Sequence, residues 1–218
     1  MRMLHHIRRW FGGAAEIDDD RWVVLDVETS GLDTKHDRLL AIAGIAVHFE
    51  HDTPRIQLGD SFEVVLRQGS AAAVADKGNI LLHGIGVNAQ RAGADPALAL
   101  SAFEAWVGES PLVAFHAAFD RAMIERTCRA ALGHCPRHAW LDLEPVAAVL
   151  WPEVRARTLD EWLAFFRIEC AVRHQAAADT LATAELMLKL WPALRRQLPR
   201  PSFRDVVALA AQRRWVQP

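Results

Sequence analysis

The chain has 218 residues, of which 51% are hydrophobic and 24% are charged, and its formal net charge is −2. This composition excludes a disordered chain, and the small net charge argues against a protein that coats nucleic acid through a broad basic surface. The sequence shows no apolar run long enough to cross a bilayer and no hydrophobic signal core at its start, so we expect a cytoplasmic protein with no membrane partner.

Three parts are predicted along the chain: a leader at residues 1–20, one domain at 21–191, and a C-terminal extension at 192–218. The start of the leader has the spacing of an amphipathic helix, and packing on the domain is favoured over contact with a partner or fraying. The extension carries arginines around an apolar stripe, which favours a docked helix with a solvated basic face over a nucleic-acid contact.

Three strands are predicted to open the domain. Residues 22–25 are apolar enough for a strand buried on both faces, and residues 39–49 and 61–66 have the composition of a second and a third strand. Pro54 and Gly59 interrupt the sequence between the last two. We therefore expect an antiparallel meander at the start of the domain.

The second half alternates strands with helices. Asp95 and Pro96 have the pattern of an N-cap and a first helical position, and Thr158 and Glu161 have the spacing of a capping box. After residues 79–85, which lead into a loop, the predicted elements are helix 96–107, strand 111–116, a helix from Asp120, strand 139–141, a helix from Asp142, a helix after Thr158, and a helix that opens after His174 and continues through Leu190. Such alternation implies parallel crossovers, so the predicted fold is an α/β fold with a mixed five-stranded sheet of three antiparallel strands plus parallel strands, flanked by helices.

The three cysteines, Cys128, Cys135 and Cys170, cannot all pair with one another, which suits a reducing compartment. His134 and His138 lie on either side of Cys135, so a zinc site that includes Cys128 is an alternative use of these residues. Ligand spacing this loose often arises by accident, and this alternative is the weaker one.

Two carboxylates, Asp26 and Glu28, follow the first predicted strand directly. Because side chains alternate across a strand, both point to the same side, and two like charges held so close repel unless a cation lies between them. Oxygen ligands favour Mg²⁺ or Mn²⁺ over zinc. On its own this pair is a weak signal, and an acidic turn after a strand is its more frequent explanation.

Two more carboxylates fall on the inward stripes of predicted helices. Asp120 shares a stripe with Met123, and Asp179 shares one with Leu186. His174 precedes Asp179 by five residues, which corresponds to about 140° around a helix. If both are to reach one site, His174 must therefore lie in the loop that enters the helix.

Each of these acids alone has an ordinary explanation, because a carboxylate near a helix N-terminus stabilises the helix dipole. Four carboxylates at one edge of a sheet, two of them on core-facing stripes, would repel one another strongly without bound cations. Two ions about 4 Å apart in such a group can activate a water and stabilise the leaving oxygen of a phosphodiester. The group as a whole therefore predicts a two-metal phosphoryl-transfer site.

These residues resemble the motifs of the DEDD superfamily of 3′–5′ exonucleases, in the DnaQ-like branch with a histidine in the third motif (DEDDh). The first motif is similar to residues 26–32 (DVETSGL), the second to 115–120 (FHAAFD) and the third to 174–179 (HQAAAD). The resemblance covers about residues 21–191 and implies an RNase H-like fold and two divalent ions, Mg²⁺ or Mn²⁺. Many relatives have His-Asn where this chain has Phe115 and His116, a departure that bears on substrate preference.

All five catalytic positions of that family are filled here, by Asp26, Glu28, Asp120, His174 and Asp179. The resemblance implies that Asp26, Glu28 and Asp179 hold the ion that activates water, and that Asp26 and Asp120 hold the second ion. It also implies that His174 is the general base, a role that suits histidine because its ordinary pKa lies near 6.5.

The resemblance further implies a set of substrate-binding residues: Thr29, Leu32, His83, His116 and Phe119. His83 belongs to a His-Gly-Ile triplet that lies beside the bound strand in relatives. For His83 and His116, a structural role with a hydrogen-bonded ring is an equally favoured alternative.

The leading hypothesis is a metal-dependent exonuclease that removes nucleoside monophosphates from single-stranded DNA 3′ ends in proofreading or repair. RNA is the alternative substrate, but relatives that degrade short RNA usually have DMEMTGL in the first motif, whereas DVETSGL is similar to the polymerase-associated proofreaders. A third hypothesis is a catalytically silent module that binds a polymerase or nucleic acid. Its expected signature is a lost carboxylate or histidine, and none is lost. A polymerase is a candidate partner, and the sequence does not predict the oligomeric state.

Overall fold

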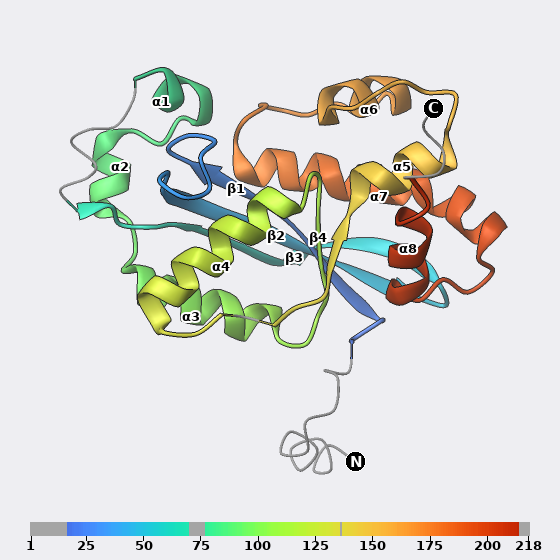
Figure 1. Cartoon of the computed structure of the whole chain (residues 1–218), viewed down its shortest axis with the longest axis horizontal. Coiled ribbons are helices and arrows are strands. Elements are labelled where there is room, and N and C mark those ends of the chain that lie inside the picture. The colour runs from blue at the N-terminus through green and yellow to red at the C-terminus, as the bar shows by residue number, and fades with distance from the viewer. Residues whose placement is uncertain (1–16, 70–76, 136, 214–218) are drawn as a thin grey trace, which may run out of the picture.

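A central five-stranded sheet carries the fold of the computed structural model, which describes residues 17–69, 77–135 and 137–213 (Figure 1). The strands are β1 (Arg21–Thr29), β2 (Leu39–Glu50), β3 (Thr53–Val65), β4 (Leu112–Ala114) and β5 (Trp140–Asp142). They lie in the order β3-β2-β1-β4-β5, with β1, β2 and β3 antiparallel and with β4 and β5 parallel to β1. The predicted mixed sheet, with its opening meander, is therefore confirmed.

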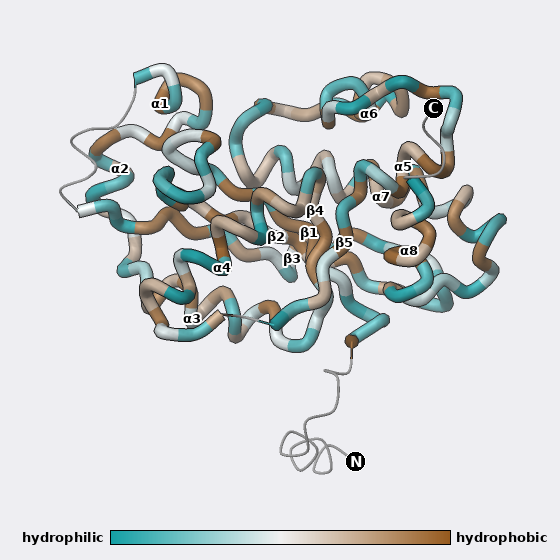
Figure 2. The backbone as a smooth tube through the Cα atoms, in the orientation of Figure 1, coloured by the Kyte–Doolittle hydropathy of each residue, from teal (hydrophilic) through white to brown (hydrophobic). Residues whose placement is uncertain are grey.

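Helices cover both faces of the sheet (Figure 1). They are α1 (Lys77–His83), α2 (Val87–Ala92), α3 (Pro96–Val107), α4 (Ala118–Leu132), α5 (Leu143–Leu150), α6 (Leu159–Phe166), α7 (Ala176–Gln197) and α8 (Phe203–Ala210). One core, which includes Val23 and Leu25, lies on the side of α3 and α4, and the other, which includes Trp22 and Val24, lies on the side of α7. Figure 2 shows hydrophobic residues along the central strands between these layers.

Several predicted helix boundaries are confirmed with their capping contacts. The Asp95 side chain accepts a hydrogen bond from Ala97 N at 3.1 Å, and Pro96 is the first residue of α3. Both halves of the predicted capping box of Thr158 and Glu161 are formed at the start of α6. Local sequence therefore sets where these helices begin.

The third strand begins earlier than predicted, at Thr53 rather than at Ser61. His51 and Asp52, with φ of 52° and 61°, form a tight turn from β2, so Pro54 lies inside β3. Proline is tolerated there because β3 is an edge strand. Gly59 belongs to a bulge in β3 and not to a connection, since the β2–β3 register shifts at this point.

Three further elements differ from the prediction. Residues 79–85 include most of α1, and α2 was not predicted; both helices are short. The strand predicted at 111–116 covers only 112–114, because His116 turns out of the sheet with a φ of 61°. Helix α7 continues through Pro192 to Gln197. Buried residues on both sides of Pro192 pack into the core, and this packing outweighs the lost backbone hydrogen bond.

The chain ends of the domain are joined by a few contacts. In α8, Phe203, Val206 and Leu209 are buried, and Phe203 N donates to Asp19 Oδ1 at 2.7 Å. The helix predicted in the leader lies outside the described residues, and the division into leader, domain and extension stays a prediction. Across the described ranges, none of the helices is long and apolar enough to cross a membrane.

Asp60, in the β3 bulge, links that strand to β1, β2 and α3. Its carboxylate accepts hydrogen bonds from Arg21 Nε and Nη2 and from Trp106 Nε1, each at 2.8 Å, and His48 Nε2 also lies 2.8 Å away. The hydrogen bonds from Arg21, and then those from His48 and Trp106, hold the pKa of Asp60 well below its usual range. This carboxylate therefore stabilises the packing of three strands and a helix.

We expect Asp60→Asn to lower the free energy of unfolding at pH 7 by about 1–3 kcal/mol, because hydrogen bonds to a charged group are lost. Since the pKa of Asp60 is depressed in the folded state, its stabilisation is present above the unfolded pKa of about 4 and is lost as the pH falls through the folded value. Urea denaturation should show that the difference in free energy of unfolding between Asp60→Asn and the wild type becomes smaller below about pH 4. Glu63→Gln, an exposed carboxylate of the same strand, is the control. A gap that stays constant in acid would contradict this role.

Candidate active site

Asp26 and Glu28 project from the C-terminal part of β1 toward α7. Val23, Leu25 and Val27 pack into the core on the α4 side, so the alternate residues of the strand face the opposite side. Glu28 accepts a hydrogen bond from the backbone N–H of Ala176, the first residue of α7. The end of the central strand thus meets the N-terminus of the longest helix.

Asp120 reaches the same place from the other side of β1. It lies in the first turn of α4, is only 4% exposed, and accepts hydrogen bonds from its own backbone N–H and from that of Val27. The turn before α4 is held by Asp142, whose Oδ1 accepts from His116 N at 2.9 Å. Strand β4 and this turn therefore place Asp120 beside β1.

Asp179 completes the group from the first turn of α7, where it is 6% exposed. Its Oδ2 accepts from His174 N at 3.1 Å, and its Oδ1 accepts from Cys170 Sγ at 3.5 Å. The Oδ1 atom also forms an ion pair with Arg173 Nη1. A hydrogen bond from Thr180 to the carbonyl of Ala43 (3.3 Å) ties this turn of α7 to β2.

The electrostatics show that the four carboxylates converge. Burial, and then the negative charges of Asp120, Asp179 and Glu28, raise the pKa of Asp26 well above its usual value. Burial and Asp179 raise the pKa of Glu28 to about 7. Burial raises the pKa of Asp120 to about 8, with smaller contributions from Asp142 and Glu28. A bound cation would relieve this mutual repulsion. Because the donor atoms are carboxylate oxygens, they suit hard divalent cations such as Mg²⁺ or Mn²⁺.

Arg173 supplies positive charge to this group, and the sequence analysis did not identify it. Its guanidinium pairs with Asp179 and with Asp160 of α6, and its charge opposes the rise in the pKa of Asp26 and of Glu28. In the described ranges, no three His, Cys, Asp or Glu side chains stand in an arrangement that could hold a metal ion. The side-chain contacts of Asp179 are those with Arg173, Cys170 and His174.

Two residues of the alternative zinc site, Cys128 and His134, have structural environments of their own. Cys128 is buried, and burial raises its pKa to about 12. His134 Nε2 lies 2.9 Å from Glu104 Oε2, with which it forms an ion pair when protonated. These contacts give the two residues structural roles on α3 and α4.

His174 lies in the loop directly before α7, as its spacing from Asp179 predicts. It is exposed, has a φ of 63°, and makes the backbone hydrogen bond to Asp179 described above. A left-handed backbone is unusual for a residue other than glycine and marks a locally constrained loop. The loop brings His174 to the edge of the carboxylate group.

The five predicted substrate-binding residues lie in different local settings. Leu32 is 87% exposed, and His116 is also exposed, with Nε2 3.0 Å from the carbonyl oxygen of Arg157. Thr29 Oγ1 donates to the carbonyl of Gly31 at 2.7 Å. Phe119 packs against the core on the α4 side. His83 is only 5% exposed, and its Nδ1 accepts from Ile85 N at 3.0 Å.

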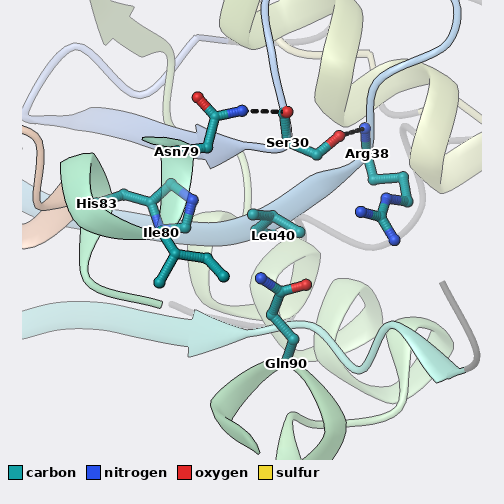
Figure 3. A pocket seen from close by; sticks show the side chains of 7 residues that line it. All are labelled: Ser30, Arg38, Leu40, Asn79, Ile80, His83 and Gln90. Atoms are coloured by element: carbon teal, nitrogen blue, oxygen red, sulfur yellow. Dashed lines mark hydrogen bonds between the residues drawn. The ribbon is translucent and has the colours of Figure 1, made fainter. Parts of the chain in front are cut away.

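A small pocket lies between the loop after β1 and the helices α1 and α2 (Figure 3). It is lined by Ser30, Arg38, Leu40, Asn79, Ile80, His83 and Gln90. Within the described part of the chain, Arg38 Nη1, His83 Nε2 and Gln90 Oε1 are buried without a hydrogen-bond partner. Because His83 Nδ1 is an acceptor, its neutral ring carries the proton on Nε2, so the pocket offers two donors and one acceptor.

Asp142 is the other site residue that the sequence analysis missed. It ends β5, and its carboxylate also accepts from Glu144 N at 3.1 Å. Burial raises its pKa, and its charge in turn raises that of Asp120. Its place at the C-terminal end of a parallel strand, next to the strand that leads to Asp120, is the signal that could have identified it.

Comparison with known families and curated proteins gives clear matches. The model of the RNase T family, described as exonuclease, matches residues 23–187. The chain is 29% identical over 175 residues to the PolC-type DNA polymerase III of Listeria innocua serovar 6a, a match that covers 80% of this chain and 11% of that protein. The corresponding polymerase of Bacillus subtilis (strain 168) is 27% identical over 175 residues, with 80% and 12% covered. The chain thus spans about a tenth of the length of these relatives.

Solved structures share the fold at lower identity. A structure of exonuclease I has a TM-score of 0.69 at 18% identity and covers 88% of this chain and 44% of its own. Exonuclease I of E. coli in complex with a dT13 oligonucleotide has the same TM-score and identity, with 83% and 43% covered. The cell-death related nuclease CRN-4 has a TM-score of 0.68 at 15% identity, with 88% and 77% covered. The RNase H-like exonuclease fold is therefore confirmed.

We expect Asp120→Asn to stabilise the protein in the absence of metal. Because the pKa of Asp120 is raised to about 8, the folded state favours the protonated form. The stability that this group contributes is fully present below the unfolded pKa of about 4 and is lost as the pH rises through the folded value. In EDTA, urea denaturation at about pH 8 should show the variant more stable by on the order of 1–3 kcal/mol, with the difference closing near pH 4.

The matched control is Glu153→Gln, an exposed carboxylate outside the site, which should leave stability unchanged at both pH values. If Asp120→Asn were less stable than the wild type at about pH 8 in EDTA, the repulsion inferred here would not exist.

Proposed function

Because the chain belongs to the RNase T family of exonucleases, we propose that it removes nucleoside monophosphates from the 3′ ends of single-stranded DNA by metal-dependent hydrolysis. The observation that carries this proposal is the convergence of Asp26, Glu28, Asp120 and Asp179 from three different elements. No structural need explains four carboxylates in mutual repulsion, two of them (Asp120 and Asp179) buried, whereas phosphodiester hydrolysis has a use for them.

The four carboxylates would hold two divalent ions, which supply an activated water and stabilise the leaving oxygen when bound. Asp26 lies among the other three and would touch both ions. Glu28 and Asp179 would share the first ion with it, and Asp120 the second. Backbone N–H groups of Val27 and Ala176 fix the orientation of Asp120 and Glu28. These supports hold the oxygens in place before substrate arrives.

His174 would accept the proton of the attacking water. Its loop position gives the imidazole access to solvent, and its backbone contact with Asp179 keeps it next to the carboxylates. A histidine can carry out this step near neutral pH and pass the proton to solvent.

A single strand is the substrate that suits the surroundings. The exposed Leu32, in the loop that follows Glu28, offers an apolar surface on which a splayed terminal base can rest. A paired terminal base must first leave its partner, which costs a few kcal/mol. Exonuclease I is a structural neighbour solved with a dT13 oligonucleotide, and the curated relatives are polymerases. These likenesses support DNA as the substrate and a polymerase as the partner.

The test is a nuclease assay on 5′-labelled strands of the same sequence, as DNA and as RNA, with Mg²⁺ or Mn²⁺. We expect fast removal of nucleotides from single-stranded DNA and from a 3′ mismatch, and slow removal from a blunt duplex end, because of the unpairing cost. The variants Asp26→Ala, Glu28→Ala, Asp120→Ala and Asp179→Ala should each be inactive while remaining folded.

The matched control in this assay is again Glu153→Gln, which should retain normal turnover. If any of the four alanine variants kept near-normal turnover, the site assignment would be wrong. If RNA were degraded faster than DNA, the proposed substrate would be RNA. Equal rates on blunt and single-stranded ends would refute the role of end fraying.

His174→Ala should lower the rate by on the order of a hundredfold or more and leave the affinity for Mn²⁺ nearly unchanged, because a general base is lost and a ligand is not. In the wild type the rate should rise with pH because a general base must be deprotonated to act, and this rise should disappear in the variant. Rates from about pH 5 to 9 and Mn²⁺ titrations measure the two effects. A parallel loss of metal affinity would make His174 a ligand instead.

A further inference from the structure

We propose that Arg173 is a built-in counterion of the carboxylate group, which occupies Asp179 in the metal-free protein and must leave it before a divalent ion can be held there. This inference rests on the proposed function in one respect, namely that the carboxylates hold metal ions. It concerns a residue to which the catalytic motifs assign no role.

The contacts of Arg173 place its charge inside the group. Nη1 pairs with Asp179 Oδ1, and Nε pairs with Asp160 Oδ1. The Arg173 side chain is 26% exposed and that of Asp179 is 8% exposed, so the ion pair with Asp179 is shielded from water. Arg173 is also close enough for its charge to act on Asp26 and Glu28. A guanidinium in this position offsets part of the repulsion between the carboxylates. In its absence, only bound metal ions would offset that repulsion.

Arg173 and a metal ion would compete for Asp179. The Oδ1 atom takes the guanidinium and the thiol of Cys170, and the Oδ2 atom takes the backbone N–H of His174. A divalent ion bound to Asp179 would also face the positive charge of the guanidinium at short range, in a poorly solvated site. Binding of the ion therefore requires displacement of Arg173.

Asp160 offers Arg173 a position to which it can withdraw. This carboxylate lies on the first turn of α6 and is 61% exposed, so its ion pair lies at the solvent side of the group. Because a different nitrogen of the guanidinium fork contacts each carboxylate, the side chain can release Asp179 and keep Asp160. Asp160 thus acts as an anchor for the displaced arginine.

The position of Arg173 next to His174 links this displacement to the general base. Both lie in the exposed loop before α7, and the N–H of His174 holds the same carboxylate that Arg173 occupies. Because Oδ2 of Asp179 accepts from the His174 N–H, an ion that binds this carboxylate would act on the same contact that holds the base in place.

The test measures metal affinity without substrate, by titrating Mn²⁺ into the full chain and following free Mn²⁺ by electron paramagnetic resonance. Arg173→Gln should bind Mn²⁺ about tenfold more tightly than the wild type, because the competing charge is gone. Without metal, its melting temperature should be lower than that of the wild type, and Mg²⁺ should raise it by more. The control is Arg196→Gln, which removes the same charge from the exposed far end of α7 and should bind as the wild type does.

A second measurement uses the unaltered protein. The Arg173 Nε–H signal, identified by its absence in the spectrum of Arg173→Gln, should shift in proportion to Mg²⁺ occupancy in nitrogen-proton NMR. Equal or weaker Mn²⁺ affinity in Arg173→Gln, or an Arg173 signal that does not respond to Mg²⁺, would overturn the counterion role and leave the exonuclease proposal standing. Absence of Mn²⁺ binding in both proteins would overturn the two together.

Discussion

Repulsion between buried carboxylates is the constraint on which the arrangement of this protein depends. Asp26 lies at the centre of the group, and three other acids raise its pKa in addition to the effect of burial. Isolated from cations, such a group costs folding energy, so the rest of the fold must hold it in place. The large apolar cores on both faces of the sheet offset that cost. The carboxylate group therefore lowers the stability of the fold that holds it, as is common at functional sites.

The sheet topology brings the acids together from distant parts of the chain. Strand β1 lies between an antiparallel and a parallel neighbour, and it carries two of the carboxylates itself. The turn after β4 adds Asp120 from one layer, and the first turn of α7 adds Asp179 from the other. Each helix N-terminus also presents N–H groups and a favourable dipole to the acids. The same features that begin the helices thus orient the site.

Local signals in the sequence were sufficient for most of the fold. The strand at 22–25, the caps at Asp95 and Thr158, and the loop position of His174 all follow from spacing and residue type. The early start of β3 and the continuation of α7 through Pro192 were not predictable this way, because tertiary packing overrode what proline favours locally. Arg173 was missed for a similar reason. Its partner Asp160 lies 13 residues away, on another helix, and no spacing rule connects them.

The two edge strands of the sheet affect how readily this chain associates with copies of itself. An open edge strand presents unpaired backbone groups, which can recruit a strand from another molecule and begin aggregation. Here β3 interrupts its own edge with a proline and a bulge, and β5 is only three residues long and is packed against α8. The C-terminal helix therefore does more than fill a surface. It packs against β5, and together with the short length of that strand and the interrupted edge of β3 this makes the sheet a poor template for a neighbouring chain.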